Sequence, residues 1–343
     1  MERVQPIRVG DRYVNPAFVH PPLPLPEETG ADDREERGFR ALIKWRMERR
    51  KYHEHVPQVE RAVRQGPVGE PPRKGIAATW VGHSSLVLQV DGKTLLLDPV
   101  WSRRIGGVVK RQTEPGVAWK DLPPIDAVVQ SHDHYDHLDA GTLKRLPRET
   151  PVFAPTGVGA WLRKRGFTSV VERSWWEDAL LDGHRLTCVP AQHFSGRTPW
   201  GRDRTLWAGW VVEGPAGSKA YFAGDTGYFQ GFRQVGEAFP GLDLALIPIG
   251  AYSPRWFMAP VHVDPPEAGQ AFLDTGAREM LPIHWGTFRL ADEPIDEPPR
   301  VLRAWWEEKG LSPGRLRIPK LGETVEVAPA TSAPIARREP EAA

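Results

Sequence analysis

Four short apolar runs along the chain each stop just before a histidine or an aspartate. The runs are Ile125 to Val129, Leu186 to Pro190, Ala220 to Gly224 and Met280 to Ile283. Each is shorter than a typical helix and bounded by polar residues or turn formers, which predicts a buried strand. Beyond their ends lie the tract that begins at Ser131, then His193, Asp225 and His284. Side chains that follow separate strands can converge at one edge of a sheet, so we expect them to form a site there.

The rest of the central region alternates between strand and helix patterns. Ile76 to Val81 and Ser85 to Val90 have the pattern of strands, and Asp91-Gly92 predicts a type I′ turn into a further strand, Lys93 to Leu97. Capping residues and apolar spacing predict helices at Asp139 to Leu146, at Gly157 to Arg165, after the N-cap Asp264, and at Pro298 to Lys309. This alternation predicts an α/β fold, and it is compatible with helices layered around two sheets.

The two ends of the chain differ from this central region. We expect residues 1–75 to form a partly helical, proline-rich N-terminal extension, residues 76–327 the main α/β domain, and residues 328–343 a disordered tail. Within the extension, Phe39 to Arg50 has an apolar stripe at helical spacing with basic residues between. Such a helix can pack on the main domain or contact a membrane, and the pattern leaves both open.

Composition narrows the classes of partner and compartment. The 45 Lys and Arg residues nearly balance the 44 Asp and Glu residues, so a formal charge of +1 gives no electrostatic case for nucleic acid. Cys188 is the only cysteine and lies in an apolar run, which excludes an intramolecular disulfide and indicates a core residue. The sequence has no apolar stretch of membrane-spanning length. We expect a cytoplasmic protein, with peripheral contact at the inner membrane surface and a homodimer left open.

The tract Ser131 to Asp139 carries the strongest chemical signal. It reads S-H-D-H-Y-D-H-L-D and packs three histidines and three aspartates into nine positions. Neutral imidazoles and carboxylates are the ligands that divalent transition metals take, so His132, His134, Asp136 and His137 could hold two neighbouring ions from one loop. A solvated polar loop without a ligand is the alternative, and the strand ends described above argue against it.

The pattern H-x-H-x-D-H, followed by a lone histidine, Gly-Asp and a late histidine, resembles the metallo-β-lactamase fold superfamily of binuclear metal hydrolases. This resemblance implies an αββα four-layer sandwich and two divalent metal ions, expected to be Zn²⁺. Carried over by position, it implies that one ion is held by His132, His134 and His193, and the other by Asp136, His137 and His284. Asp225 would bridge the two ions.

Other segments narrow the resemblance. Gly82-His83-Ser84-Ser85, Ile247 to Phe257 (I-P-I-G-A-Y-S-P-R-W-F), His262-Val263-Asp264-Pro265 and Ile283 to Phe288 look like the N-acylphosphatidylethanolamine-hydrolysing phospholipase D and its bacterial relatives. The family implies a phospholipid-like substrate, cleaved at a phosphodiester to phosphatidic acid and an N-acylethanolamine. Two metal ions suit this chemistry, because a metal-bound hydroxide is available near neutral pH and the cations stabilise charge at phosphorus.

Four further residues have predicted roles around the metal ions. Asp98 ends a strand and is expected to orient a ligand histidine, although a simple strand-end cap explains it nearly as well. Catalytic roles are expected for Asp136, Asp98 and His262, with His262 also contacting the substrate phosphate or assisting the leaving group. Arg255 is a candidate phosphate clamp and His83 a candidate substrate contact. For His262, Arg255 and His83 alike, a structural role is the alternative.

Two other function classes remain open from the sequence. The same binuclear site could hydrolyse a lactone, a cyclic phosphate or a β-lactam. A di-iron redox protein, or a metal-binding module without turnover, is a further alternative. Redox use is disfavoured because the proposed ligands are mostly histidines and no flavin-binding segment is evident.

Overall fold

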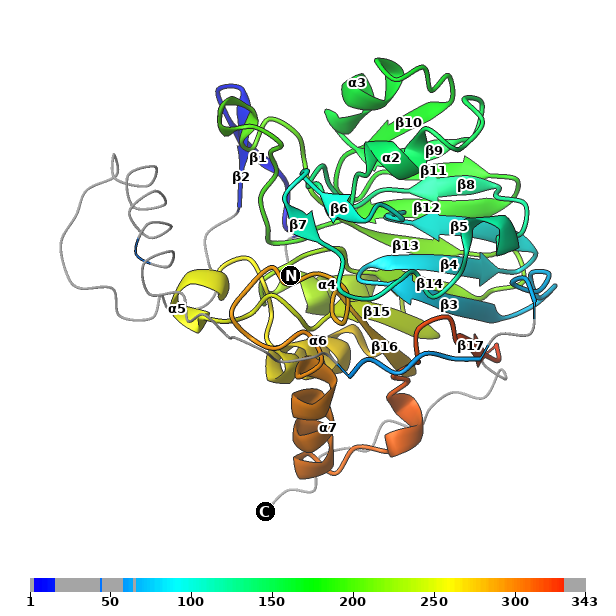
Figure 1. The fold of residues 1–343 in the computed structure, drawn as a ribbon, viewed down its shortest axis with the longest axis vertical. Helices are drawn as coiled ribbons and strands as arrows, with labels where there is room; N and C mark the ends of the chain where they lie inside the picture. Colours follow the sequence, from blue (N-terminus) through cyan, green and yellow to red (C-terminus); the bar gives the residue numbers. More distant parts are fainter. Residues whose placement is uncertain (1–2, 16–43, 45–57, 64–65, 330–343) are drawn as a thin grey trace.

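Two mixed β-sheets lie face to face at the centre of the computed structural model, which describes residues 3–15, 44, 58–63 and 66–329 (Figure 1). The first sheet has seven strands in the order β10 (Val170–Arg173), β9 (Val152–Pro155), β8 (Ala127–Val129), β5 (Lys93–Leu97), β4 (Ser85–Val90), β3 (Ile76–Gly82) and β17 (Thr324–Val327). The second has six in the order β11 (Asp178–Leu181), β12 (His184–Val189), β13 (Gly209–Glu213), β14 (Lys219–Phe222), β15 (Leu244–Pro248) and β16 (Glu279–Ile283).

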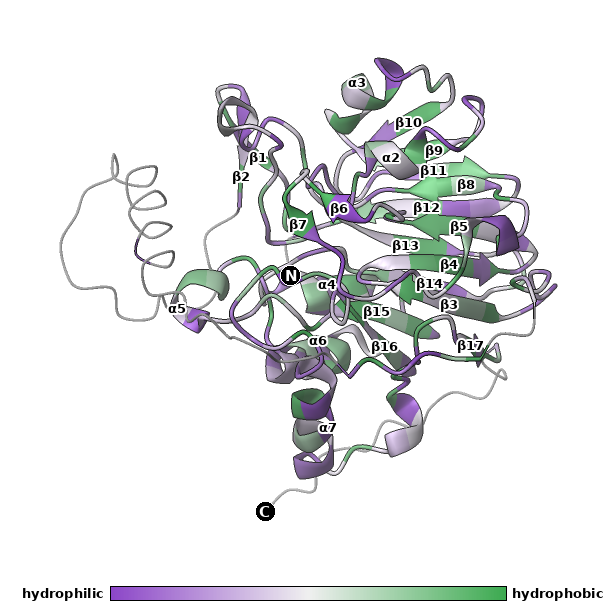
Figure 2. Cartoon of the chain, in the orientation of Figure 1, coloured by the Kyte–Doolittle hydropathy of each residue, from purple (hydrophilic) through white to green (hydrophobic). Residues whose placement is uncertain are grey.

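Both faces of the first sheet are covered, and its strands are apolar on both faces for this reason. On β4, Leu86 and Leu88 pack into the core between the sheets, whereas Val87 packs into a separate cluster on the outer face. On β5, Leu96 faces outward in the same way. Strands buried on both faces carry continuous rather than alternating apolar residues. The central strands are accordingly mostly hydrophobic in Figure 2.

Helices cover the outer faces of the two sheets and complete four layers. The helices α2 (Ala140–Leu143) and α3 (Val158–Arg163) place Leu143, Val158 and Leu162 in the outer cluster of the first sheet. The helix α6 (Pro265–Thr275) packs against both α4 (Gly231–Ala238) and α7 (Pro298–Glu308) on the side of the second sheet. The other described helices are the short helix α5 (Arg255–Met258) and the 3-10 helices η2 (Trp119–Asp121), η3 (Pro199–Gly201) and η4 (Pro313–Arg315).

Local signals in the sequence predicted several of these elements. Asp139 caps α2 by accepting from the backbone N–H groups of Gly141 and Thr142, although the helix ends at Leu143. Asp264 and Glu267 form the reciprocal capping box at the start of α6. The turn between β4 and β5 has positive φ at both central residues, as a type I′ turn requires.

The four apolar runs are strands, but they belong to two sheets. Strand β8 lies in the first sheet, whereas β12, β14 and β16 lie in the second. The expectation that all four deliver their side chains at one edge of one sheet is therefore wrong in that detail. Because the sheets are stacked, the loops after these strands meet between neighbouring sheet edges, where a site can draw on both layers (Figure 1).

The N-terminal region forms a β-hairpin that was not predicted from its sequence. Strands β1 (Ile7–Val9) and β2 (Arg12–Val14) form a hairpin, and Val4 and Tyr13 join the main core. The proposed domain boundaries stay a prediction. The amphipathic segment Phe39 to Arg50 lies outside the described residues except for Lys44, and so does the tail from residue 330. Among the described helices, none has both the length and the apolar character needed to cross a membrane.

Candidate metal centre

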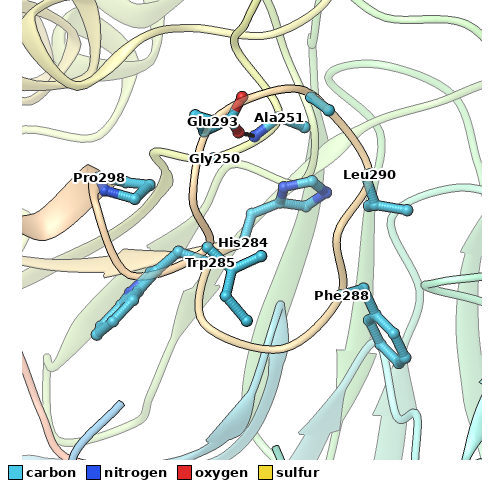
Figure 3. A pocket seen from close by; sticks show the side chains of 10 residues that line it. Gly250, Ala251, His284, Trp285, Phe288, Leu290, Glu293 and Pro298 are labelled. Atoms are coloured by element: carbon cyan, nitrogen blue, oxygen red, sulfur yellow. Dashed lines mark hydrogen bonds between the residues drawn. The ribbon is translucent and has the colours of Figure 1, made fainter. Parts of the chain in front are cut away.

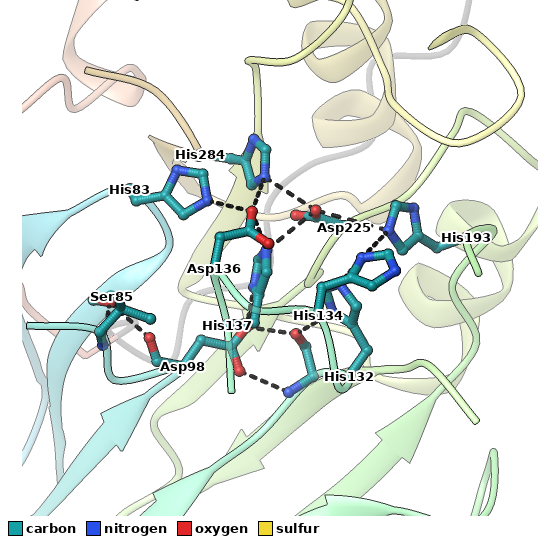
Figure 4. Close-up of polar contacts among 12 residues, drawn as sticks. His83, Ser85, Asp98, His132, His134, Asp136, His137, His193, Asp225 and His284 are labelled. Carbon is teal, nitrogen blue, oxygen red and sulfur yellow. Dashed lines mark hydrogen bonds and ion pairs between the residues drawn. The ribbon is translucent and has the colours of Figure 1, made fainter. Parts of the chain in front are cut away.

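The tract after β8 supplies four side chains that converge between the sheets (Figure 4). His132 and His137 are buried, and His134 and Asp136 are half-buried. The N-cap at Asp139 and a backbone hydrogen bond from Leu138 to the His134 carbonyl fold the tract into a tight turn. This turn brings residues that are close in sequence to opposite sides of one site.

Three strands of the second sheet deliver the other side chains. His193 follows β12, Asp225 follows β14 and His284 follows β16, and all three are buried. Gly224 allows this approach, because a Cβ there would lie 2.8 Å from the Ala208 carbonyl oxygen and from the Ser131 Cβ. Its φ of 63° also favours glycine. The glycine before Asp225 therefore lets the two sheets come together at the site.

A first group consists of three imidazoles, from His132, His134 and His193. His132 Nε2 lies 2.9 Å from His134 Nδ1, and His193 Nε2 lies 3.2 Å from the same atom. The other ring nitrogens of two of them are already engaged: His132 Nδ1 lies 2.8 Å from the Ser131 hydroxyl and His193 Nδ1 lies 2.9 Å from the Val261 carbonyl oxygen. Those contacts orient each Nε2 toward the common point.

A second group consists of His83, Asp136, His137 and His284. His137 Nε2 and His284 Nε2 lie 3.4 Å and 3.6 Å from Asp136 Oδ2. His83 joins them by donating from Nε2 to the same oxygen at 2.9 Å. The sequence predicted His83 as a substrate contact from the G-H-S-S turn. The hydrogen bond of His83 to Asp136 could not be predicted from the sequence.

Asp225 lies between the two groups. Its Oδ2 is 3.2 Å from His137 Nε2 and 3.0 Å from His284 Nε2 in the second group, and 3.9 Å from His193 Nε2 in the first. Every predicted ligand thus lies in one of two adjacent clusters or between them, as the resemblance implies.

The donor set fits two divalent cations. Within the described residues, His137 Nε2 and His284 Nε2 lie 3.0 to 3.6 Å from carboxylate oxygens but lack hydrogen-bond geometry, and Asp225 Oδ1 has no hydrogen-bond partner. Buried polar atoms are almost always paired, and these three face one another across the site. Imidazole nitrogens and carboxylate oxygens in this number suit Zn²⁺ and similar ions. The buried His/Asp clusters are therefore consistent with a binuclear metal site.

The protonation of the rings supports the same interpretation. Burial lowers the pKa of His83 and His193 to about 3 and that of His134 to about 4, so these rings are neutral near pH 7. Burial alone would also lower the pKa of His284, but the carboxylates of Asp225 and Asp136 raise it to about 9. Metal ligands must be deprotonated, and a bound cation would take the place of that proton beside the carboxylates.

Asp98 connects both groups from below the site. Its Oδ2 accepts a hydrogen bond from His137 Nδ1 at 2.6 Å and another from the Ser131 hydroxyl, which in turn faces His132 Nδ1. Its Oδ1 accepts from the Ser131 backbone N–H at 2.7 Å and from Gln130 Nε2 at 2.8 Å. One buried carboxylate is therefore linked to a histidine in each group, which is more than a strand-end cap requires.

His262 and Arg255 lie on the wall of the site. The His262 ring centroid is 5.0 Å from that of His193 and 5.3 Å from that of His284. Arg255 donates to the His262 carbonyl oxygen at 2.8 Å and to Glu267 Oε2 at 2.7 Å. The predicted phosphate clamp stays a prediction, and it would require Arg255 to share its donors with this carboxylate.

A second wall, beside His284, was missed by sequence reasoning (Figure 3). Glu293 is buried and accepts from the backbone N–H groups of Ala251, Tyr252 and Ser253 at 2.6, 3.2 and 3.0 Å, which fixes the segment after β15. A cavity of about 10 Å³, with room for roughly one water, lies between this segment and the His284 ring. Only the contacts across 42 residues reveal that this glutamate supports the site.

Comparison with known proteins agrees with this geometry. Residues 93–285 match the model of the β-lactamase superfamily domain. An uncharacterized protein of Mycobacterium tuberculosis is 44% identical over 262 residues, which cover 73% of this chain and 68% of that protein. The N-acyl-phosphatidylethanolamine-hydrolyzing phospholipase D 1 of Caenorhabditis elegans is 38% identical over 260 residues, which cover 69% of this chain and 73% of that protein.

Solved structures agree as well. Igni18, a metallo hydrolase of Ignicoccus hospitalis, superposes with a TM-score of 0.58 at 25% identity and covers 74% of this chain and 98% of its own. With two stacked sheets between helices and the His/Asp clusters at their edge, the chain belongs to the metallo-β-lactamase superfamily.

Proposed function

We propose that this protein is a binuclear metal-dependent phosphodiesterase of the phospholipase D type, acting on N-acylphosphatidylethanolamine-like lipids. The superfamily membership and the clustered ligands support metal-dependent hydrolysis. The 38% identity to a nematode protein named for hydrolysing N-acylphosphatidylethanolamine supports this lipid class. The observation that carries the proposal is the position of Asp225, within 4 Å of histidines from both groups.

In this proposal the seven predicted ligands hold two divalent ions, expected to be Zn²⁺. His132, His134 and His193 would hold one; Asp136, His137 and His284 would hold the other; Asp225 would contact both. Such ions lower the pKa of water toward neutrality and offset charge on phosphoryl oxygens during attack at phosphorus.

The remaining side chains position these ligands and handle protons. Asp98 holds His137 and, through Ser131, His132 with their Nε2 atoms toward the site. His83 fixes the Asp136 carboxylate by donating from Nε2. His262, half-buried beside both groups, is placed to contact the phosphate or to transfer a proton to the leaving alcohol.

The test is hydrolysis of a defined N-acylphosphatidylethanolamine by purified full-length protein in ¹⁸O-labelled water, with metal quantified in the same preparation. If water attacks phosphorus and the P–O bond to the N-acylethanolamine breaks, the phosphatidic acid should carry the label and the released N-acylethanolamine should not. Release of fatty acid, or turnover only of a lactone, cyclic phosphate or β-lactam in a parallel panel, would replace the proposed substrate while leaving the metal centre intact. Redox turnover of the bound metal would refute hydrolysis itself.

A further inference from the structure

Exposed apolar and basic side chains gather on three turns beside the metal centre. Val9 lies at the β1–β2 turn, Val108 lies between β6 (Arg104–Ile105) and β7 (Val109–Lys110), and Trp200 lies on η3, with exposed fractions of 64%, 77% and 80%. We call residues 7–14, 103–110 and 197–204 the rim. Large apolar side chains this exposed are unusual when several lie on adjoining segments.

Direct contacts join the three rim segments to one another. The β6–β7 turn packs on the metal tract, since a Cβ at Gly106 would lie 3.5 Å from the Tyr135 ring. The Tyr135 hydroxyl donates to the Arg197 carbonyl oxygen at 2.8 Å. On the other side, the Tyr13 backbone N–H donates to the Asp203 carbonyl oxygen at 2.6 Å. The β1–β2 and β6–β7 hairpins accordingly lie on the same side of the molecule (Figure 1).

The rim is also anchored directly to the metal centre. Arg197 Nη1 donates to the carbonyl oxygens of Asp133 and Leu138 in the metal tract, at 2.7 and 2.8 Å. Asn15, next to β2, donates from Nδ2 to the His193 carbonyl oxygen at 2.6 Å. Phe194, which leads into the rim, packs its ring 4.5 Å from that of His134. A surface that the rim contacts would therefore lie next to the ligands.

The charge of the rim is distinct from that of the chain. Its three segments contain eight basic and two acidic residues, a formal charge of +6, whereas the whole chain has +1. The basic residues are Arg8, Arg12, Arg103, Arg104, Lys110, Arg197, Arg202 and Arg204. Basic residues next to an exposed tryptophan suit an anionic lipid surface, which attracts the charges and accepts the apolar tips.

We propose that the rim docks the protein onto an anionic lipid bilayer so that the metal centre faces the headgroups. The apolar side chains stand singly on separate turns, which suits a fluid surface better than the shaped surface of a protein partner. This inference rests on the proposed lipid substrate and adds the surface from which the protein takes it.

The experiment is co-sedimentation of the full-length, metal-loaded protein with phosphatidylcholine vesicles, with and without phosphatidylglycerol. Binding is expected only with the anionic lipid, and it should weaken as salt is added. The double variant Val108→Ser/Trp200→Ser should lower vesicle affinity about tenfold, while Leu180→Ser, an equally exposed residue on β11, should not. Arg104→Gln/Arg202→Gln should lower affinity at least tenfold, and the matched charge change Arg300→Gln/Arg303→Gln on α7 should leave it unchanged.

Hydrolysis separates this proposal from the proposed function. Rim variants should lose activity on vesicle-embedded substrate but retain activity on a short-chain analogue that is monomeric in solution. The proposed docking role of the rim would be refuted if the rim variants bound vesicles like the wild type, or if the remote controls lost as much affinity. It would also be refuted if the protein bound no vesicles at all, even if the monomeric lipid is hydrolysed. Rim-dependent vesicle binding without lipid hydrolysis would support the rim and reject the proposed substrate.

Discussion

Replacing Asp98 with asparagine gives a sharp test of how the two metal groups are held. The carboxylate accepts from His137 Nδ1, Ser131 N–H, the Ser131 hydroxyl and Gln130 Nε2, so both of its oxygens act only as acceptors. Asparagine offers one oxygen and one NH₂ group. In either orientation of the amide, its NH₂ group must face hydrogen-bond donors. When the NH₂ group faces His137 Nδ1, that nitrogen must accept, which favours the His137 tautomer with its proton on Nε2.

The magnitude follows from these contacts. Losing a residue that orients a ligand histidine typically weakens metal binding 10- to 100-fold, or about 1.4 to 2.8 kcal/mol. Because Asp98 reaches His137 directly and His132 through Ser131, we expect Asp98→Asn to weaken both ions rather than one. Unpaired buried donors should also lower the free energy of unfolding by about 1 to 3 kcal/mol.

Asp91→Asn is the matched control. Asp91 is also buried, has positive φ, and accepts from the Ser218 hydroxyl and from the N–H groups of Gly75 and Ala216, and none of the histidines that the structure describes is hydrogen-bonded to it. Chelator competition followed by metal quantification measures affinity, and chemical denaturation measures stability. Both variants should lose stability, and only Asp98→Asn should lose metal. Equal metal affinity in the two variants would reduce Asp98 to a strand-end cap.

Three other predictions concern the ligands and the wall. Asp225→Ala should abolish turnover and lower bound metal with the fold retained by circular dichroism; full activity with two ions bound would remove its bridging role. His262→Ala should keep both ions but lower kcat by about 10² to 10⁴, and unchanged kinetics would leave this ring a structural part of the wall. In the metal-free protein the pKa of His284 is raised from 6.5 to about 9, so its contribution to stability is complete below about pH 6.5 and is lost as the pH rises through about 9. The Tm of the metal-free protein should fall over that window, and that of His284→Asn should fall less; parallel curves would contradict the raised pKa.

The sequence could nominate the proposed ligands, which the structure brings together, because their signals are local. Each ligand follows an apolar run, and the order of tract, histidine, Gly-Asp and late histidine survives in one dimension. The capping box of α6 and the turn at Asp91-Gly92 are local as well, and both have the expected form. What local signals could not give is the pairing of strands, so the division of the four runs between two stacked sheets appeared only in three dimensions.

The sequence did not reveal the structure of segment 194–204 or the role of Glu293, for a related reason. The segment 194–204 has no apolar periodicity, and it is ordered by contacts with residues far away in the chain, such as those of Asp133 and Tyr13. In the sequence, nothing distinguishes Glu293 from a surface glutamate. In the structure, it accepts hydrogen bonds from three backbone N–H groups of residues 251–253.

Asp98 illustrates the difference between what the local sequence pattern predicts and what strand pairing determines. By pattern it is one more polar residue after an apolar strand, no different from the predicted ligands, yet it lies beneath them rather than among them. The difference arises because β5 pairs in parallel with β8, which places its end directly beside the start of the metal tract. Its neighbour in the sheet, not its own sequence context, thus directs its carboxylate to His137 and, through Ser131, to His132. A strand-end acid therefore becomes a candidate ligand or a support for ligands according to which strand it pairs with.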